Sequence, residues 1–243
     1  MTKSPLLITS VLSAYAISAN KIFGFDQRRQ QTFNALESIV KLNIFKWIVI
    51  VDGSNKKLLS QDEISQYAKR GVVIEQLCFQ QDIEAVIRYG KSNGEVQIVN
   101  FAIDNSKIIN EFQEFYKISG RYFIRNLTKI VAKMDCYDNL FYFDNPFFFN
   151  KNKKFVTTYF YKTNVNFYKT VLYGLKNETS IEKEGYLESV YFRAIEKRKD
   201  KSISLEFPFV IAIAGTTGLN AINRWYILRN LFSRLGFLAF SFK

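Results

Sequence analysis

The sequence contains no histidine among its 243 residues. This absence excludes Ser-His-Asp and Cys-His nucleophile systems, imidazole metal ligands and histidine general bases. Any proton transfer must therefore fall to Asp, Glu, Tyr or Lys. Cysteine is nearly absent too, since the chain has only Cys78 and Cys136, in no metal-binding or redox spacing. We therefore expect two isolated thiols in a reducing compartment.

Proline and glycine are scarce, at 3 and 11 residues, and we find no low-complexity run, Ser/Gly linker or internal repeat. The length, with 48% hydrophobic residues, suits one core and a small appendage. We predict one domain over 1–223 and a basic amphipathic helix over 224–243. That helix would either lie on an anionic bilayer, or close the core or form an oligomer contact.

The formal net charge is +12, so the partners are expected to be anionic. Nucleic acid, phosphorylated cofactors and anionic lipids all qualify. The charge is scattered, and no RNP aromatic motif, KH loop or basic block is present, which argues against a nucleic-acid partner. No run is long and clean enough for a transmembrane helix. We therefore expect a cytoplasmic protein, with peripheral contact at the inner face of the cytoplasmic membrane as a further option.

The N-terminal segment allows two interpretations. Lys3 followed by the largely apolar stretch Leu6–Ile17 is typical of a secretory signal. However, Thr9, Ser10 and Ser13 interrupt that stretch, whereas a signal core is usually uniformly apolar. A buried first strand over Leu6–Leu12 is the preferred interpretation.

Hydrophobic periodicity predicts alternating strands and helices in the first half of the chain. The expected strands are Leu6–Leu12, Trp47–Val51, Val72–Leu77 and Phe115–Ile118, and the expected helices are Gln27–Leu42 with Asp26 as its cap, Gln61–Lys69, Ile83–Arg88 and Glu95–Ile103. Such alternation favours a doubly wound α/β layer, in which ligands bind at the carboxyl ends of the strands. The second half is aromatic-rich and less regular: we expect a turn at Asp144-Asn145-Pro146, strands at Phe155–Tyr161 and Phe209–Ala214, and a helix over Ile181–Lys197.

Three segments together resemble the bacterial GT-A glycosyltransferases of capsule and lipopolysaccharide loci. They are Arg28-Arg29-Gln30-Gln31-Thr32 followed by the turn Asp52-Gly53-Ser54, then Lys91-Ser92-Asn93-Gly94-Glu95, then Tyr116-Lys117-Ile118-Ser119-Gly120-Arg121-Tyr122. A weaker echo is Tyr186-Leu187-Glu188 ahead of Gly215-Thr216. The resemblance implies a GT-A-like, Rossmann-related and mostly parallel sheet flanked by helices. It also implies transfer of a sugar from a nucleotide-sugar donor to a saccharide or lipid-linked saccharide acceptor in surface-polysaccharide synthesis.

The sequence departs from the usual GT-A pattern because it has no metal-binding Asp-x-Asp. Asp135 and Asp138 form only an Asp-x-x-Asp, and Asp144 stands alone. No cofactor is therefore certain, and dependence on Mg²⁺ or Mn²⁺ stays open. The same gap supports an alternative, a non-catalytic or degenerate module that binds a nucleotide or polysaccharide.

Charge builds on the diphosphate leaving group as the glycosidic bond breaks, so a transferase needs cations there. Arg121, Lys117 and Arg29 are the candidates, because fixed cations can substitute for a metal. The competing interpretation for each is a solvated surface charge. Glu188 is the candidate for the carboxylate that takes the acceptor proton, with Glu95 and Asp144 as rivals.

The nucleotide is expected to contact residues at three strand ends. Asp52, Gly53 and Ser54 follow one buried strand, Thr9 and Ser10 lie near the end of another, and Gly120 belongs to the third strand-end motif. Glu95 is included as a binding residue, although it could merely favour the start of its helix. The competing interpretation of the Asp52 turn is an ordinary turn held by an Asx hydrogen bond. Gly215–Gly218 is either a flexible acceptor or phosphate loop or a plain turn.

Overall fold

A seven-stranded sheet forms the centre of the molecule, in the strand order β3-β2-β1-β4-β7-β6-β9. The computed structural model describes residues 1–13, 23–142, 155–182, 185–196, 208–212 and 239–242. Four neighbouring strands run parallel: β1 (Leu6–Ser10), β2 (Trp47–Asp52), β3 (Val73–Cys78) and β4 (Glu114–Ser119). The other three, β6 (Asn139–Tyr142), β7 (Phe160–Asn164) and β9 (Ala239–Phe242), pair antiparallel, and β5 (Tyr122–Ile124) pairs with β8 (Val210–Ala212) in a separate small sheet.

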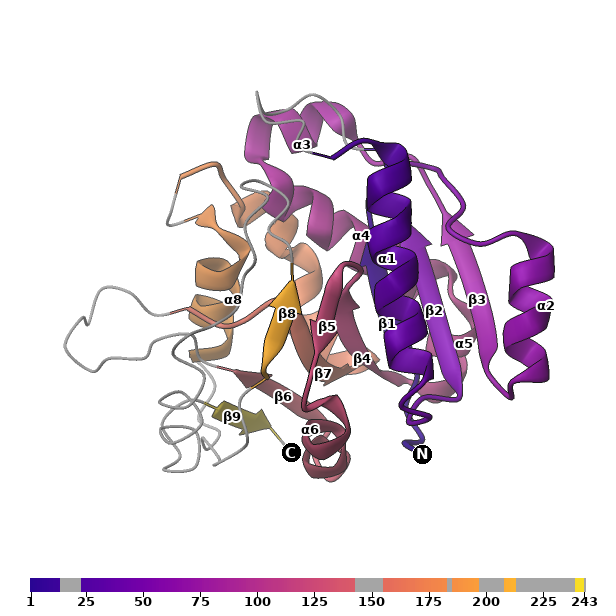
Figure 1. Ribbon diagram of the computed structural model, residues 1–243. Helices are drawn as coiled ribbons and strands as arrows, with labels where there is room; N and C mark the ends of the chain where they lie inside the picture. Colours follow the sequence, from indigo (N-terminus) through magenta and orange to yellow (C-terminus); the bar gives the residue numbers. More distant parts are fainter. Residues whose placement is uncertain (14–22, 143–154, 183–184, 197–207, 213–238, 243) are drawn as a thin grey trace.

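Helices cover both faces of this sheet, which is why β1 and β2 are mainly apolar (Figure 1). The face with Ile8 and Ile118 is covered by α1 (Phe25–Val40), α2 (Gln61–Lys69) and α6 (Leu127–Met134). The face with Leu7 and Phe115 is covered by α4 (Lys91–Asn105), α5 (Lys107–Phe112), α7 (Val165–Phe167), the π-helix η1 (Tyr168–Leu172), the 3₁₀-helix η2 (Tyr173–Glu178) and α8 (Leu187–Glu196). A short helix, α3 (Ile83–Tyr89), precedes α4. The α/β class predicted from the sequence is thus confirmed.

The register of the parallel strands brings their carboxyl ends to one edge. Ser10 lies opposite Asp52, and Thr9 lies opposite Ser119. Asp52 in turn lies opposite Cys78 at the end of β3. Polar residues that end three different strands therefore share this carboxyl edge of the sheet.

Most predicted elements of the first half are confirmed, and two boundaries differ from the prediction. Gly24, not Asp26, is the N-cap of α1, and Asp26 lies in the first helical turn, where a carboxylate favours the helix dipole. Helix α4 begins at Lys91, so Glu95 lies beyond its first turn and does not cap it. The sequence did not predict the earlier start because Asn93 and Gly94 are poor helix formers, yet both are buried residues of α4.

The second half departs further from the prediction. The expected helix Ile181–Lys197 begins only at Leu187, and the expected strand Phe155–Tyr161 is replaced by β7, which begins at Phe160. The predicted C-terminal helix is wrong for its last residues, because Ala239–Phe242 form strand β9, which pairs with β6. Their alternation of small or polar residues with Phe suits a strand.

Several predictions lie outside the described residues. They are the turn at 144–146, the Gly215–Gly218 loop and residues 224–238 of the predicted terminal helix. The division at residue 224 therefore stays a prediction. Within the described part of the chain, both cysteines are free thiols, as expected. None of the described helices combines the length and the apolar character needed to cross a membrane.

Gly120 is required where β4 leaves the sheet next to β1. Its N–H donates to the Thr9 carbonyl at 2.8 Å, and a Cβ there would lie 2.7 Å from that same oxygen. Because the obstacle is backbone, we expect Gly120→Ala to lower the free energy of unfolding by about 1–3 kcal/mol.

Gly174→Ala is the matched control for this substitution, since a Cβ at Gly174 meets no atom within 4 Å. Urea denaturation of the two variants and the wild type measures the difference. Equal stability of the two variants would contradict the close approach of Gly120 to β1.

Candidate functional site

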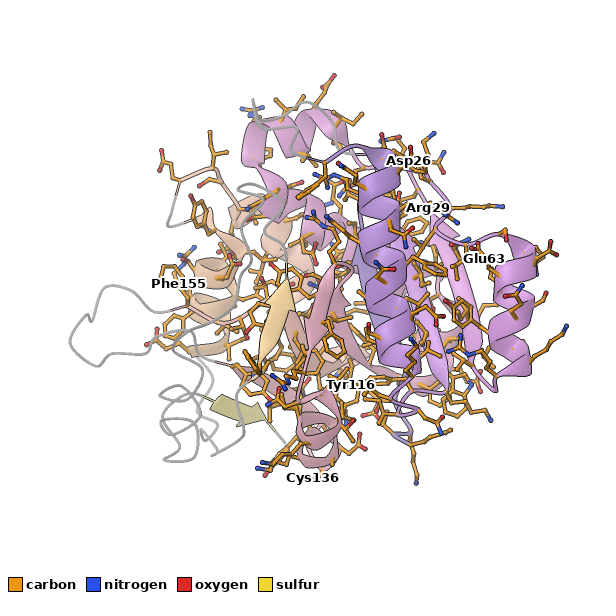
Figure 2. All side chains as sticks on the ribbon, in the orientation of Figure 1. Asp26, Arg29, Glu63, Tyr116, Cys136 and Phe155 are labelled. Atoms are coloured by element: carbon orange, nitrogen blue, oxygen red, sulfur yellow. The ribbon has the colours of Figure 1, made fainter. Side chains whose placement is uncertain are left out.

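The carboxyl edge brings together most of the site residues predicted from the sequence. Because β2 and β4 both pair with β1, Asp52 and Arg121 lie at the same edge, with the end of β1 between them. The other candidates come from the loops after these strands, from α4 and from the start of α8. Figure 2 shows Asp26 and Arg29 toward one end of α1, and Tyr116 and Cys136 toward the other.

The Asp52 carboxylate is buried and saturated with hydrogen bonds from its own chain. Its Oδ2 accepts from the Leu12 N–H at 2.8 Å. Its Oδ1 accepts from the Ser54 N–H at 2.8 Å, the Ser54 hydroxyl at 2.6 Å and the Lys56 N–H at 3.1 Å. The first contact ties the loop after β1 to the turn after β2. The geometry is that of an Asx-type turn, the competing interpretation of this motif, and contact of Asp52 with a nucleotide stays a prediction.

Gly53 and Ser54 complete this junction. The Gly53 N–H donates to the Ser10 carbonyl at 2.9 Å, and the Ser54 hydroxyl accepts from the Ser13 N–H at 2.9 Å. A Cβ at Gly53 would lie 2.6 Å from the side chain of Gln81, whose amide donates to the Gly94 carbonyl. Glycine is thus needed here for the approach of Gln81, a residue that sequence reasoning missed.

A second group of side chains surrounds the buried ammonium of Lys117; we call it the Lys117 cluster, comprising Thr9, Glu95, Lys117, Ser119 and Thr158. Lys117 is 1% exposed and forms an ion pair with the Glu95 carboxylate. Its Nζ also donates to the Ser119 hydroxyl at 3.0 Å and the Thr158 carbonyl at 2.8 Å. An ammonium has three protons, so these three acceptors satisfy it. Lys117 was predicted as a phosphate-binding cation, yet its charge is already compensated by Glu95.

Glu95 connects the cluster to β1. Its Oε1 accepts from the Thr9 hydroxyl at 2.8 Å in addition to the Lys117 contact. The predicted residues Thr9, Glu95 and Lys117 are therefore brought together, from β1, α4 and β4 respectively.

Glu188 lies beside this cluster, in the first turn of α8. Its Oε1 accepts from the Thr158 hydroxyl at 3.1 Å, and its carbonyl accepts from the Val156 N–H at 3.1 Å. Its side chain is half-buried. Thr158 thus connects the two residues: its carbonyl accepts from Lys117, and its hydroxyl donates to Glu188.

Tyr122, another residue that sequence reasoning did not single out, lies among these charges. Burial raises the pKa of the Tyr122 hydroxyl, the positive charge of Arg121 opposes this, and the negative charges of Glu95 and Glu188 raise it further. The ring stacks on that of Tyr159, with centroids 5.4 Å apart. Arg121, Glu95 and Glu188 therefore all act on one aromatic side chain.

Arg121 is half-buried, and its Nη1 lies 3.5 Å from the amide oxygen of Gln31 on α1. Burial lowers its pKa, and the nearby charge of Arg28 lowers it further. Arg28 was quoted in the sequence motif but not assigned a role. Its i, i+3 spacing from Gln31 was the signal that both share one face of the helix.

Arg29 is engaged between two helices. Its Nε donates to the Leu58 carbonyl at 3.0 Å, and its Nη2 lies 3.3 Å from the Glu63 carboxylate of α2 (Figure 2). This contact explains Arg29 as a link between α1 and α2, and a role at the phosphates stays a prediction.

The described carboxylates do not fit a divalent metal ion at this edge. No group of three or more Asp, Glu or Cys residues that could hold a metal is found in the described part of the chain. Asp52 is saturated by N–H and O–H donors, and Glu95 is paired with Lys117. Asp135 accepts from Thr2 and from the Tyr116 hydroxyl near the start of β4, at the opposite edge. Asp144 lies outside the described residues.

No family model matches the chain, and no curated protein matches it. Among solved structures, a candidate glucose-1-phosphate thymidylyltransferase from Bacillus anthracis in complex with sucrose has a TM-score of 0.47 at 11% identity, over 95% of both chains. GalNAc-T7 with UDP, GalNAc and Mn2+ has a TM-score of 0.45 at 9% identity, over 79% of this chain and 40% of that one. HddC from Yersinia pseudotuberculosis has a TM-score of 0.41 at 10% identity, over 80% and 99%. Similarity at this level carries no argument about the site, which rests on its own geometry.

The Lys117–Glu95 ion pair predicts an asymmetry between its two partners. Lys117 is 1% exposed and Glu95 is 26% exposed, so only Glu95 can be rehydrated when its partner is lost. We expect Glu95→Gln to destabilise the protein by about 3 kcal/mol, because it leaves a buried ammonium uncompensated. Lys117→Met should cost only about 1 kcal/mol, since methionine fills the same space.

Chemical denaturation of the two single variants and the double variant measures this cycle. The double variant should be more stable than Glu95→Gln alone. If Lys117→Met proved the more damaging change, the ion pair would not be what holds the buried ammonium.

Proposed function

We propose that the chain is a GT-A-type glycosyltransferase. It moves a sugar from a nucleotide-sugar donor to a saccharide or lipid-linked saccharide acceptor, in bacterial surface-polysaccharide synthesis. The observation that carries the proposal is the Lys117 cluster at the carboxyl edge of the sheet, to which the half-buried carboxylate of Glu188 is joined through the Thr158 hydroxyl. Ligands of α/β sheets bind at this edge.

Sugar transfer needs two kinds of group, and this edge offers both. Negative charge develops on the diphosphate as the glycosidic bond breaks, and a fixed cation there lowers the barrier. Arg121 fills that role, because its guanidinium binds phosphate oxygens in a bidentate manner and meets no carboxylate in the described residues. The acceptor hydroxyl must lose a proton as it attacks the anomeric carbon, and a carboxylate takes it.

Glu188 suits the role of base better than Glu95. The Glu95 carboxylate is paired with the buried Lys117 and accepts from Thr9 as well, so it is engaged by two internal partners. Glu188 accepts from Thr158 through one oxygen, Oε1, in the described structure. Its other oxygen is therefore the one offered to the acceptor.

The nucleoside end of the donor is assigned to the junction between β1 and β2. Thr9 and Ser10 end β1, and the Asp52-Gly53-Ser54 turn holds the loop that follows it. Because the Asp52 carboxylate is saturated, we expect it to act by fixing the shape of this loop. Gly120 holds the end of β4 against the same strand, at Thr9.

A second function is favoured by one observation, the engagement of the described carboxylates. Asp52 and Glu95 are both committed to internal partners, and no described cluster suits a metal ion. A non-catalytic module that binds a nucleotide or polysaccharide would have the same features. Membrane contact through 224–243, on the cytoplasmic side, belongs to the transferase proposal and concerns residues largely outside the described part.

A panel of UDP-, GDP- and CMP-sugars tests the proposal. We expect one donor, at about 100 times its Kd, to stabilise the protein by about 2.7 kcal/mol, which raises Tm by about 5–10 °C. The same donor should lose its sugar to an acceptor, followed by release of the nucleotide. A donor that stabilises the protein without transfer or hydrolysis would support the binding module, and salt-sensitive RNA binding with no donor response would oppose both.

Glu188→Gln tests the base. We expect kcat to fall by about 10²–10⁴-fold with little change in KM for the donor, because the amide cannot accept the proton. The matched control is Glu178→Gln, an exposed carboxylate in η2. Steady-state kinetics measure both, and a Glu188→Gln enzyme with wild-type kcat would remove this residue from the mechanism.

A further inference from the structure

Two half-buried arginines, Arg28 and Arg121, meet α1 one helical turn apart near the carboxyl edge, and both contact neutral oxygens. Arg28 of α1 donates from Nη1 to the Val11 carbonyl at 3.3 Å and from Nε to the Phe23 carbonyl at 3.2 Å. Arg121 reaches the same helix one turn later, at the amide oxygen of Gln31. Both arginines are half-buried.

The electrostatics of the two side chains agree with this geometry. Burial lowers the pKa of Arg121, the charge of Arg28 lowers it further and Tyr122 opposes these effects, whereas no carboxylate raises it. Burial also lowers the pKa of Arg28. Two like charges held together in a partly desolvated place destabilise the free protein, unless an anion joins them.

Four other cations of the described residues are each paired with a carboxylate. The pairs are Lys117–Glu95, Lys162–Glu114, Arg29–Glu63 and Arg70–Glu37. In the described residues, Arg28 and Arg121 contact only neutral oxygens. Arg28 and Arg121 thus combine partial burial with the lack of a carboxylate partner among the described residues, whereas the four paired cations each have one.

We infer that Arg28 and Arg121 form a binding site for a diphosphate, with Gln31 as a neutral hydrogen-bonding neighbour. This inference rests on the proposed function and deepens it, since it identifies the groups that take the leaving-group charge. A diphosphate presents oxygens on two adjacent phosphoryl groups, so two planar guanidinium forks can each bind one group. Two fixed cations supply the charge that the described carboxylates cannot recruit through a metal ion.

Gly120 and the loop after β1 bring the two arginines to this place. The Gly120 N–H, directly before Arg121, donates to the Thr9 carbonyl, and a Cβ at Gly120 would lie 3.2 Å from the Thr32 side chain of α1. Arg28 is held to the loop after β1 through Val11, next to the Leu12 N–H that Asp52 binds. The same junction that shapes the proposed nucleoside site thus orients the cations, which agrees with a nucleotide whose diphosphate continues from it.

The inference is tested with inorganic pyrophosphate as the probe, in buffer with EDTA, by isothermal titration calorimetry. We expect the wild type to bind pyrophosphate more tightly than orthophosphate, and Arg28→Gln and Arg121→Gln each to weaken pyrophosphate binding by about tenfold or more. Arg28→Lys keeps the positive charge but loses the planar guanidinium fork, so its affinity for pyrophosphate should lie between those of the wild type and Arg28→Gln. Arg70→Gln, which removes an arginine paired with Glu37, is the matched control and should bind as the wild type does.

A second measurement separates binding from folding. Without anion, Arg28→Gln should be at least as stable to heat as the wild type, because it removes a repulsion, whereas loss of a merely structural arginine would lower Tm. Pyrophosphate binding that Arg28→Gln and Arg70→Gln alter equally would overturn the inference. So would equal binding of pyrophosphate and orthophosphate.

Two further ligands distinguish whether the diphosphate belongs to the sugar donor or to a lipid-linked acceptor. A nucleoside diphosphate that binds more tightly than pyrophosphate, with the same loss in Arg28→Gln, identifies the donor. Geranyl diphosphate binding in that way identifies a lipid-linked acceptor, and either result keeps the diphosphate site. Pyrophosphate binding without any sugar transfer would support the diphosphate site and refute the transferase proposal. Sugar transfer that Arg28→Gln does not change would support the transferase proposal and refute the diphosphate site.

Discussion

The ammonium of Lys117 is buried at the carboxyl end of β4, and the site is built around the groups that satisfy it. A lone charge of this kind would cost several kcal/mol, so the fold must bring a carboxylate to it. Glu95 of α4 does so, and it also binds Thr9 of β1. Thr158 closes the arrangement from the other side and holds Glu188. The position of the proposed base is therefore linked, through Thr158, to the neutralisation of a buried lysine.

The opposite edge of the sheet shows the same chemistry put to a structural use. Lys162 is buried and paired with Glu114, and Asp135 accepts from the Tyr116 hydroxyl and from Thr2. Those contacts tie the first residues of the chain to α6 and β4. Cations there are balanced by carboxylates, whereas Arg28 and Arg121 at the carboxyl edge are not. The comparison separates a charge that serves folding from one that is kept available for a ligand.

Local patterns predicted the first half of the fold well, because its elements are locally consistent. The apolar runs of β1 and β2 identify strands covered on both faces, and Ser60 with Glu63 forms a capping box that starts α2 at the predicted residue. The partners of buried polar groups could not be predicted in this way. Nothing near Asp52 in the sequence shows that Leu12 will donate to it, and nothing near Lys117 identifies Glu95. These contacts depend on strand register and on the helix that crosses the sheet, which are properties of the whole chain. For the same reason Arg28 was overlooked, while Arg29, its neighbour, was chosen although it pairs with Glu63.

The absence of an Asp-x-Asp and the presence of two neighbouring arginines both concern how positive charge is supplied to a bound diphosphate. A diphosphate needs positive charge wherever it binds, and the carboxylates that would recruit a metal ion are, in the described residues, committed elsewhere. Fixed arginines solve the problem differently, because their repulsion is present before the ligand arrives. That repulsion lowers the stability of the free protein, and a bound anion relieves it, so stability and ligand affinity are linked through the same two side chains. A residue pair that weakens the free fold persists where a ligand restores the balance, and this is the physical reason for assigning Arg28 and Arg121 to binding instead of folding.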